Sequence, residues 1–411
     1  RAISRRRFLQ GAAALQLAVF VRRGEATALF VDLAGPDPAP GPAQGSHAPA
    51  APDAPARPAG LVPLGVFVAV DTDETVTVTV PRPDMGQGPR TSLAMTVAEE
   101  LEVDWTAVRV RQAPAGSEYG DQTSGGSTST RVHHRGMLLA GATAREMLVR
   151  AAAAAWGVPR ESCRATAGTV EHSPTGRRLT YGSLAESAAA MGVPPASEVT
   201  LKSPAEYTIV GRPTSRIDNP DVVTGRAVYG SDVRVPGMRV AVVARPPAFG
   251  ARLEGYQEAA ALAVPGVRQV VPVSGCVAVF ANHTWAALAG RQALAATWAP
   301  GPNVWLDDDS LRERLISAVG ALPTAPPGAA VVIDAAYDVP YLAHATMEPM
   351  NCVADCRHDS CELWAPTQAP GSVRTAVANA LRLPADRVTV NVALSGGGFG
   401  RRLQTDYATE A

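Results

Sequence analysis

The chain has 411 residues, with 37 basic and 38 acidic side chains and a formal net charge of −1. This length suits two or three domains, and the near-neutral balance excludes the broad basic surface of a nucleic-acid-binding protein. The one lysine, Lys202, follows no glycine-rich loop, which also excludes a phosphate-loop ATPase.

The first 28 residues have the pattern of an export signal. Residues 4–10 (SRRRFLQ) fit the twin-arginine motif, and residues 11–21 form an apolar stretch too short to span a bilayer. Residues 26–28 (ATA) offer a small-x-small cleavage site. We therefore expect a periplasmic protein exported by the twin-arginine route, which carries folded and often cofactor-loaded proteins. Membrane association stays open.

Residues 29–60 are rich in Pro, Ala and Gly and predict an extended linker. A first folded domain is expected over residues 61–205. Its predicted elements are strands at 66–70 and 75–80, a helix at 91–101, a strand at 107–111, a polar segment at 116–131 and an alanine-rich helix at 137–156.

A second domain is expected over residues 206–300, with short β segments and Pro-Gly turns. Further Pro- and Gly-rich stretches predict a boundary within 300–328, and a last domain over 325–411. The predicted elements of these two domains are a helix at 285–295, a hairpin at 352–364, a helix at 371–381 and a strand at 388–394. The expected fold class is α+β, with several domains.

Three glycine-rich loops carry the candidate chemistry: GGGFGR at 396–401, MGQG at 85–88 and GGS at 125–127. The first lacks the third glycine of a dinucleotide-binding turn. Consecutive glycines can adopt positive φ and aim several N–H groups at one acceptor. The second loop precedes a helix N-terminus, whose free N–H groups can bind a phosphate. The third loop adds a hydroxyl group, which can also donate a hydrogen bond to a phosphate. Together they predict a large anionic cofactor held by backbone and hydroxyl donors.

These motifs together resemble the large subunit of molybdenum hydroxylases of the xanthine dehydrogenase and aldehyde oxidase superfamily. The match is best to the N-terminal part of the isoquinoline 1-oxidoreductase beta-subunit type. Within 206–300, the stretch VTGRAVYGSDVRVPGM is similar to the superfamily's α/β hammerhead domain. YLAHATMEPM at 341–350 and WAPTQ at 364–368 are similar to the start of its molybdopterin-binding domain, which would be partial here. Residues 61–205 would contact the dinucleotide.

The resemblance implies an oxidoreductase that hydroxylates N-heteroaromatics or oxidises aldehydes, with water as the oxygen source. Its cofactor would be molybdopterin cytosine dinucleotide with molybdenum. Electrons would pass to [2Fe–2S] clusters on a small iron–sulfur subunit, and a cytochrome c is one candidate acceptor beyond it. No side chain of this chain would bind the metal directly. The implied cofactor-binding residues are Gln368, Gly396, Gly397, Gly398, Phe399, Gly400, Arg401, Met85, Gly86, Gln87, Gly88, Gly125, Gly126 and Ser127.

By the same resemblance, Gln368 would hydrogen-bond an oxo ligand of the metal and Phe399 would shape the substrate pocket. The family's general base, a glutamate in a late Gly-Glu motif, would lie beyond residue 411. The catalytic residue is therefore unknown, and we expect this chain alone to be inactive. Glu348 and His344 lie near the implied pocket without an assigned role.

Two alternatives stay open at the level of function. One is a non-catalytic exported module, or a split fragment, with the same fold. The other is a flavin or nicotinamide oxidoreductase that uses the GGGFG turn.

Cys352, Cys356 and Cys361 cluster with His358 in the sequence. Their spacing, C-x3-C-x4-C, matches neither zinc pairs nor ferredoxin runs. A metal site is one hypothesis. The other is a pair of strands around a turn at 357–360, with the cysteines as small apolar residues or as one disulfide.

Overall fold

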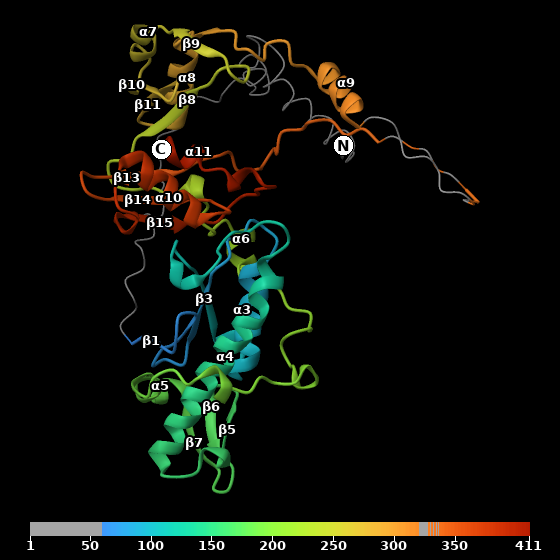
Figure 1. The fold of residues 1–411 in the computed structure, drawn as a ribbon. Helices are drawn as coiled ribbons and strands as arrows, with labels where there is room; N and C mark the ends of the chain where they lie inside the picture. Colours follow the sequence, from blue (N-terminus) through green and yellow to red (C-terminus); the bar gives the residue numbers. More distant parts are fainter. Residues whose placement is uncertain (1–59, 320–327, 329, 332, 334, 336) are drawn as a thin grey trace, which may run out of the picture. The chain divides into compact units, whose positions relative to one another are not determined.

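The computed structural model describes residues 60–319, 328, 330–331, 333, 335 and 337–411 (Figure 1). These residues belong to two compact units. The larger unit contains residues 60–235 and 346–411, and the smaller unit contains the described residues between 236 and 345. The predicted signal and, apart from Gly60, the predicted linker lie outside the described residues.

A four-stranded sheet in the order β1-β2-β3-β4 organises the first part of the larger unit. The first three strands are antiparallel, whereas β3 and β4 run parallel, because the chain returns through a crossover helix. In β3 the valines alternate with threonines, and all three valines are fully buried. The strands and covering helices are β1 (Val62–Pro63), β2 (Val68–Val70), β3 (Val76–Val80), β4 (Val108–Gln112), α3 (Pro89–Leu101) and α4 (Ser129–Trp156).

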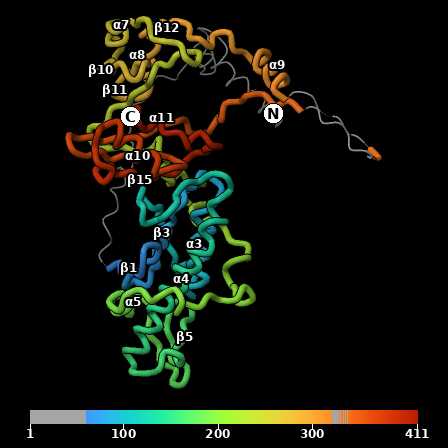
Figure 2. Tube along the Cα trace, in the orientation of Figure 1, coloured from blue at the N-terminus to red at the C-terminus, as the bar shows by residue number. Residues whose placement is uncertain are grey.

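Helices α3 and α4 lie side by side in both ribbon and tube views (Figures 1 and 2). Near their starts, Ser92 Oγ lies 3.4 Å from Thr130 Oγ1. Further along, Arg145 on α4 donates to Glu100 Oε2 on α3 at 3.0 Å. The two helices therefore run in the same direction and begin at the same end. Gly141 makes this packing close, because a side chain there would overlap the backbone of α3.

A second sheet and one helix extend this core. The sheet is antiparallel in the order β5-β6-β7. Tyr181 begins the helix, and its buried hydroxyl donates to the Leu101 carbonyl at 2.6 Å. The elements are β5 (Cys163–Thr166), β6 (Thr169–His172), β7 (Arg177–Thr180) and α5 (Tyr181–Ala190).

Two buried carboxylates at the end of α3 fix the segment that follows α5. Glu99 accepts hydrogen bonds from Lys202 Nζ at 2.6 Å and from the N–H groups of residues 208–210. Glu100 accepts the backbone N–H of Lys202 at 3.0 Å. Burial opposes the charged form of Glu99, but these donors outweigh it and lower its pKa. The single lysine thus has a structural contact.

The C-terminal part of the larger unit is a three-stranded sheet in the order β13-β14-β15. β13 and β14 form an antiparallel hairpin, while β14 and β15 are parallel and joined by helix α10, which covers one face. An isolated parallel bridge pairs Tyr229 with Leu394. The bounds are β13 (Val353–Cys356), β14 (Cys361–Ala365), β15 (Val388–Val392) and α10 (Pro370–Leu381).

The smaller unit has an antiparallel sheet, β10-β11-β8, and a separate pair, β12-β9. Gly290 on α8 packs directly against Val267 and Val279 of this sheet. The elements are β8 (Val240–Ala244), β9 (Arg252–Gly255), β10 (Val267–Val273), β11 (Cys276–Ala281), β12 (Thr297–Ala299), α7 (Glu258–Leu262), α8 (Thr284–Ala293) and α9 (Asp308–Val319).

Short helices complete the described chain. Among the described residues, no helix is both long and apolar enough to cross a membrane. The short helices are α6 (Asn219–Val223), α11 (Asp406–Thr409) and 3-10 turns at Trp105–Ala107, Ser117–Tyr119, Arg160–Ser162, Ala196–Glu198, Pro204–Glu206, Gly230–Asp232, Ala385–Arg387 and Arg401–Leu403.

The expected α+β, multi-domain class is confirmed. The expected start of the alanine-rich helix, residue 137, is wrong, because α4 begins at Ser129. That first stretch is polar and none of its residues is buried, so it lacks the apolar pattern from which the helix was predicted. Residues 61–205 and 346–411 share one unit, and the predicted hammerhead range 206–300 is divided between the two. The hammerhead assignment itself stays a prediction.

Replacing Gly141 by alanine should destabilise the larger unit by about 1–3 kcal/mol, because the new methyl group overlaps the Val97 carbonyl. The matched control is Gly136→Ala in the same helix, where a methyl meets nothing within 4 Å. The control should stabilise by about 0.5–1 kcal/mol through helix propensity. Urea unfolding followed by circular dichroism measures both, and equal midpoints for the two variants would contradict the close packing.

Candidate functional site

The three glycine-rich loops predicted from the sequence meet in the larger unit. A methyl group added at Gly398 would overlap Met85 Sδ and would lie 2.6 Å from Gln368 Oε1. Gly125, in the third loop, faces Leu403 just beyond the GGGFGR run, with its Cβ position 3.6 Å from the leucine side chain. The fold therefore brings together residues from the two ends of the described chain.

The side chain of Gln368 links two of these loops. It is 3% exposed. Its Nε2 donates to the Ser124 carbonyl at 2.7 Å, and its Oε1 accepts the Gly400 N–H at 3.1 Å. The backbone reinforces the link, since Ser124 N–H donates to the Gln368 carbonyl at 2.8 Å. Ser124 was missed by sequence reasoning, which stopped at the neighbouring glycines. One hydrogen of Nε2 is left without a protein acceptor among the described residues.

A buried ion pair packs against the GGGFG loop and binds its backbone. Arg402 Nη2 donates to Glu348 Oε2 at 2.8 Å, and its Nε donates to the Gly397 carbonyl at 2.7 Å. The two carboxylate oxygens of Glu348 also accept the N–H groups of Gly396 and Ser231, both at 2.9 Å. Burial lowers the pKa of Arg402, and the nearby carboxylate opposes that shift. Glu348 therefore shapes the loop, and Arg402 is a further residue that the sequence did not single out for this purpose.

Phe399 projects from this loop into solvent. It is 74% exposed and has a φ of 51°, a left-handed conformation that bulky residues rarely adopt. Its neighbours Gly397 and Gly400 have φ values of 98° and 97°. Such strain costs on the order of 1–3 kcal/mol and persists only where the surroundings enforce it. The anchored loop thus presents an aromatic ring that suits contact with a ligand.

The MGQG loop is closed mainly by its own side chains. Gln87 Oε1 accepts the Met85 N–H at 2.8 Å. The buried carboxylate of Asp84 accepts the Gly86 N–H at 2.8 Å and the Arg90 N–H, in the first turn of α3, at 3.3 Å. Asp84 therefore occupies the start of α3 with negative charge, which disfavours a phosphate there. An aspartate before a glycine turn was the sequence signal that could have revealed this.

The start of α4 differs in this respect. Gly126 and Ser127 both adopt left-handed φ angles, 57° and 55°. The N-cap residue Thr128 makes no side-chain cap, because its hydroxyl donates to the Gly125 carbonyl at 2.7 Å. Side chains thus leave the first-turn N–H groups uncapped, at the positive end of the helix dipole. Of the two helix starts, this one suits an anion.

Arg401 was predicted to be a cofactor-binding residue. In the structure its guanidinium is bidentate to Asp406, with distances of 2.8 and 2.6 Å. Its contact with the cofactor stays a prediction, and its charge is already largely neutralised.

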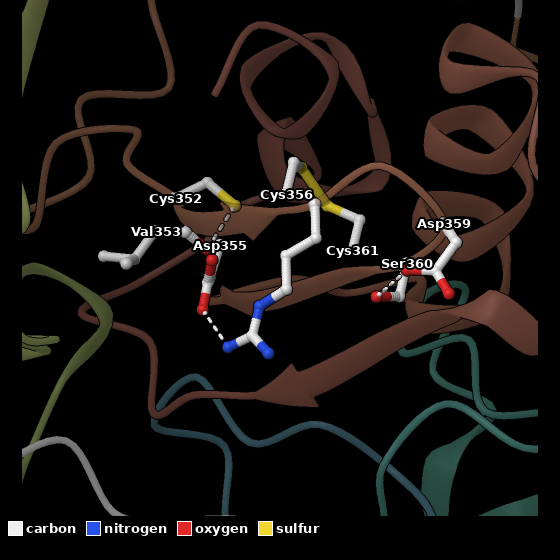
Figure 3. Close-up of a disulfide and its surroundings, with 8 residues drawn as sticks. Cys352, Val353, Asp355, Cys356, Asp359, Ser360 and Cys361 are labelled. Atoms are coloured by element: carbon white, nitrogen blue, oxygen red, sulfur yellow. Dashed lines mark hydrogen bonds and ion pairs between the residues drawn. A yellow bond between two sulfur atoms is a disulfide. The ribbon is translucent and has the colours of Figure 1, made fainter.

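The cysteine cluster is resolved in favour of a disulfide. Cys356 and Cys361, paired across the end of the β13–β14 hairpin, are bonded to each other (Figure 3). The metal hypothesis for this cluster is wrong, because two of its three sulfurs are consumed. Cys352 remains a thiol, and burial raises its pKa to about 12. Within the described ranges, no group of three His, Cys, Asp or Glu side chains is placed to hold a metal.

Replacing Gln368 by glutamate should destabilise the larger unit by about 1–3 kcal/mol, because a carboxylate oxygen would then face the Ser124 carbonyl. The same change at exposed Gln404 adds an equal charge and should leave stability within about 0.5 kcal/mol. Urea unfolding gives the stabilities, and amide exchange at Gly400 reports the loop directly. Unchanged exchange at Gly400 would show that the cross-link is not needed.

The Cys352 thiol should react slowly with iodoacetamide in the folded protein. Burial raises its pKa to about 12, so little of the reactive thiolate is present near neutral pH. The rate should rise about tenfold per pH unit between about pH 7 and about pH 9. Mass spectrometry of the peptide that contains Cys352 measures it, with the urea-unfolded chain as control. A rate independent of pH would contradict the shift.

Comparison with known proteins agrees with this geometry. Two families, each described as "Molybdopterin cofactor-binding domain", match residues 7–240 and residues 311–411. The first match covers more than half of the chain.

Three curated relatives are similar over most of the chain. The beta subunit of isoquinoline 1-oxidoreductase from Brevundimonas diminuta is 31% identical, over 84% of this chain and 52% of that protein. A membrane-bound aldehyde dehydrogenase [pyrroloquinoline-quinone] from Gluconacetobacter polyoxogenes is 28% identical, over 84% and 48%. A nicotinate dehydrogenase subunit from Pseudomonas putida is 28% identical, over 85% and 31%.

The chain thus spans about half, or less, of the length of these relatives. The family resemblance drawn from the glycine loops and the WAPTQ segment is confirmed. The chain belongs to the molybdopterin cofactor-binding domain family and is homologous to the isoquinoline 1-oxidoreductase beta subunit and related molybdenum hydroxylase large subunits.

Proposed function

We propose that this chain forms the cofactor-binding part of a molybdenum oxidoreductase subunit. The complete protein would hydroxylate N-heterocycles or oxidise aldehydes, with water as the oxygen source. The observation that carries the proposal is the junction of the GGGFGR and MGQG loops with Gln368, where a methyl group added at Gly398 would overlap Met85. Gln368 in turn donates to Ser124, next to the third loop. The names of the relatives, which include isoquinoline, nicotinate and aldehyde enzymes, support the two substrate classes.

The residues at this junction fit a pterin cofactor. Among the described residues, the N–H groups of Gly397, Gly398 and Phe399 have no acceptor, and the spare N–H of Gln368 can donate to an oxygen ligand. The uncapped start of α4, with Gly126 and Ser127, suits the phosphates of a cytosine dinucleotide. Asp84 rather than a phosphate occupies the start of α3.

When bound, the cofactor supplies a two-electron redox centre for the substrate. The protein's contribution is to orient it. Gln368 fixes the spacing of two loops, Arg402 and Glu348 hold the glycine backbone, and the strained Phe399 places an aromatic wall beside the centre. A planar aromatic substrate can stack on such a ring. Glu348 takes no part in proton transfer in this proposal, because both its oxygens accept protein donors.

The partner and the location are also proposals. The names of two relatives designate subunits, which supports a small iron–sulfur subunit as electron acceptor, with a cytochrome c as a candidate beyond it. Residues 4–10 support export to the periplasm by the twin-arginine route. The Cys356–Cys361 disulfide supports the same location, since disulfides persist in oxidising compartments.

Expression in a host that makes molybdopterin cytosine dinucleotide tests the cofactor. The purified chain should contain molybdenum, and acid treatment should release cytidine monophosphate in equal amount. Flavin absorbance without molybdenum would favour the flavin alternative, and pyrroloquinoline quinone would favour the cofactor in the name of the aldehyde dehydrogenase relative. None of these groups would favour a non-catalytic module.

The α4 anion site has a charge-matched test. Gly126→Asp and Gly126→Asn place side chains of one shape at a left-handed position, where a Cβ makes only an ordinary 3.9 Å contact with Thr128. Both residue types tolerate that conformation. The aspartate should reduce bound cytidine monophosphate about fivefold or more relative to asparagine, because it repels phosphate at the helix start. Released nucleotide is quantified by chromatography. Equal nucleotide content in the two variants would exclude α4 as the phosphate site.

A further inference from the structure

A cavity of about 820 Å³ in the larger unit adjoins the site described above, and Asp84 and Arg90 at the start of α3 belong to both. All five residues of β4 line one wall. Trp364, Thr389 and Asn391 line another, and they alternate along their strands with residues buried under α10. The open face of the β13–β14–β15 sheet and the free edge of β4 therefore share one hollow.

The outer edge of β4 pairs with no strand in the part of the chain that the structure describes. β4 is the last strand of its sheet. Ala113 N–H donates to Val80, which places the carbonyls of Val108 and Val110 on the outer edge. From the described residues, those carbonyls accept only long bonds of 3.4 Å, donated by the guanidinium groups of Arg109 and Arg90. Open strand edges pair readily with added chains, and arginines along such an edge repel a basic chain and favour an acidic one.

The cavity carries surplus positive charge. Its lining includes Arg90, Arg109 and Arg111, none of which forms an ion pair with a carboxylate within the described residues. The lining aspartates are already paired, Asp84 and Asp218 with Arg216 and Asp221 with Arg226. Burial lowers the pKa of Arg90, although Asp218 and Asp84 oppose that shift. A carboxylate entering the cavity would meet arginines that form no ion pair with a carboxylate in the described part of the chain.

Three hydrogen-bond donors in these walls are also unpaired. Trp364 Nε1, Arg90 Nε and Arg111 Nε are shielded from solvent and have no acceptor among the described residues. An unsatisfied buried donor costs about 1–3 kcal/mol. An occupant that supplies oxygen acceptors, reached by small side-chain rotations, would relieve this cost.

We propose that this cavity is a docking groove for an extended, acidic polypeptide segment that pairs with the outer edge of β4. A free edge offers a row of backbone groups, which a polypeptide can match and a compact small molecule cannot. The arginines select carboxylates. In two relatives, about half of the protein lies outside the matched part. Such proteins therefore contain further polypeptide that could supply the segment. This inference does not depend on the proposed redox function.

Two heptapeptides test the groove with the whole chain. One alternates glutamate and valine, the other lysine and valine, and benzoate serves as a small acid. The glutamate peptide should slow amide exchange in β4 about tenfold or more at saturation. It should not protect β7, which is an edge strand of another sheet. The lysine peptide and benzoate should protect neither strand.

Equal protection by benzoate would make this a small-acid site and overturn the proposal. No β4 protection by the glutamate peptide, or equal protection by the lysine peptide, would overturn it too. The variant R109E/R111E should reverse the peptide preference, so that the lysine peptide binds and the glutamate peptide no longer does. The control R212E/R387E makes the same charge change at exposed arginines outside the cavity and should keep the original preference. An unchanged preference in R109E/R111E would contradict the role of these arginines.

Discussion

The buried amide of Gln368 is the interaction on which the candidate site depends. It donates to Ser124 and accepts from Gly400, so it joins segments that lie far apart in the sequence. An amide suits this place because it supplies a donor and an acceptor without a charge, whereas a buried carboxylate would carry a large desolvation penalty. The glycine at 398 is the matching constraint, since only the absence of a side chain lets Met85 and Gln368 approach it.

The ion pair beneath the loop serves geometry more than stability. A buried pair such as Glu348–Arg402 gives back much of its Coulomb energy as desolvation, so it is weak evidence for a stabilising role. Its role is to orient the loop backbone, since Arg402 binds the carbonyl of Gly397 and Glu348 binds the N–H of Gly396. That rigidity explains how Phe399 is held in a strained conformation while exposed to solvent.

Charge is distributed unevenly over the two helix starts. Asp84 neutralises the start of α3, whereas the start of the 28-residue helix α4 stays uncapped by side chains. The dipole of α4 therefore remains open to an anion, and the arginines at the edge of β4 make a second, chemically different cationic feature. The start of α4 would bind through backbone N–H groups, and its expected ligand is a phosphate. The edge of β4 would bind through guanidinium groups, and its expected ligand is an acidic strand.

The sequence by itself determined the family, the α+β class and most elements of regular structure, because alternating Val and Thr, Ala-rich runs and glycine clusters are local signals. It also identified the three loops. Only the tertiary structure decided that Ser124 and Arg402 bind these loops. It also decided that Asp84 accepts an N–H group at the start of α3 and that Arg401 forms an ion pair with Asp406. These are pairings between residues, several of them distant in the chain, and a residue's partner is set by packing. The disulfide follows the same logic: the sequence left metal and disulfide open, and the hairpin register placed Cys356 opposite Cys361.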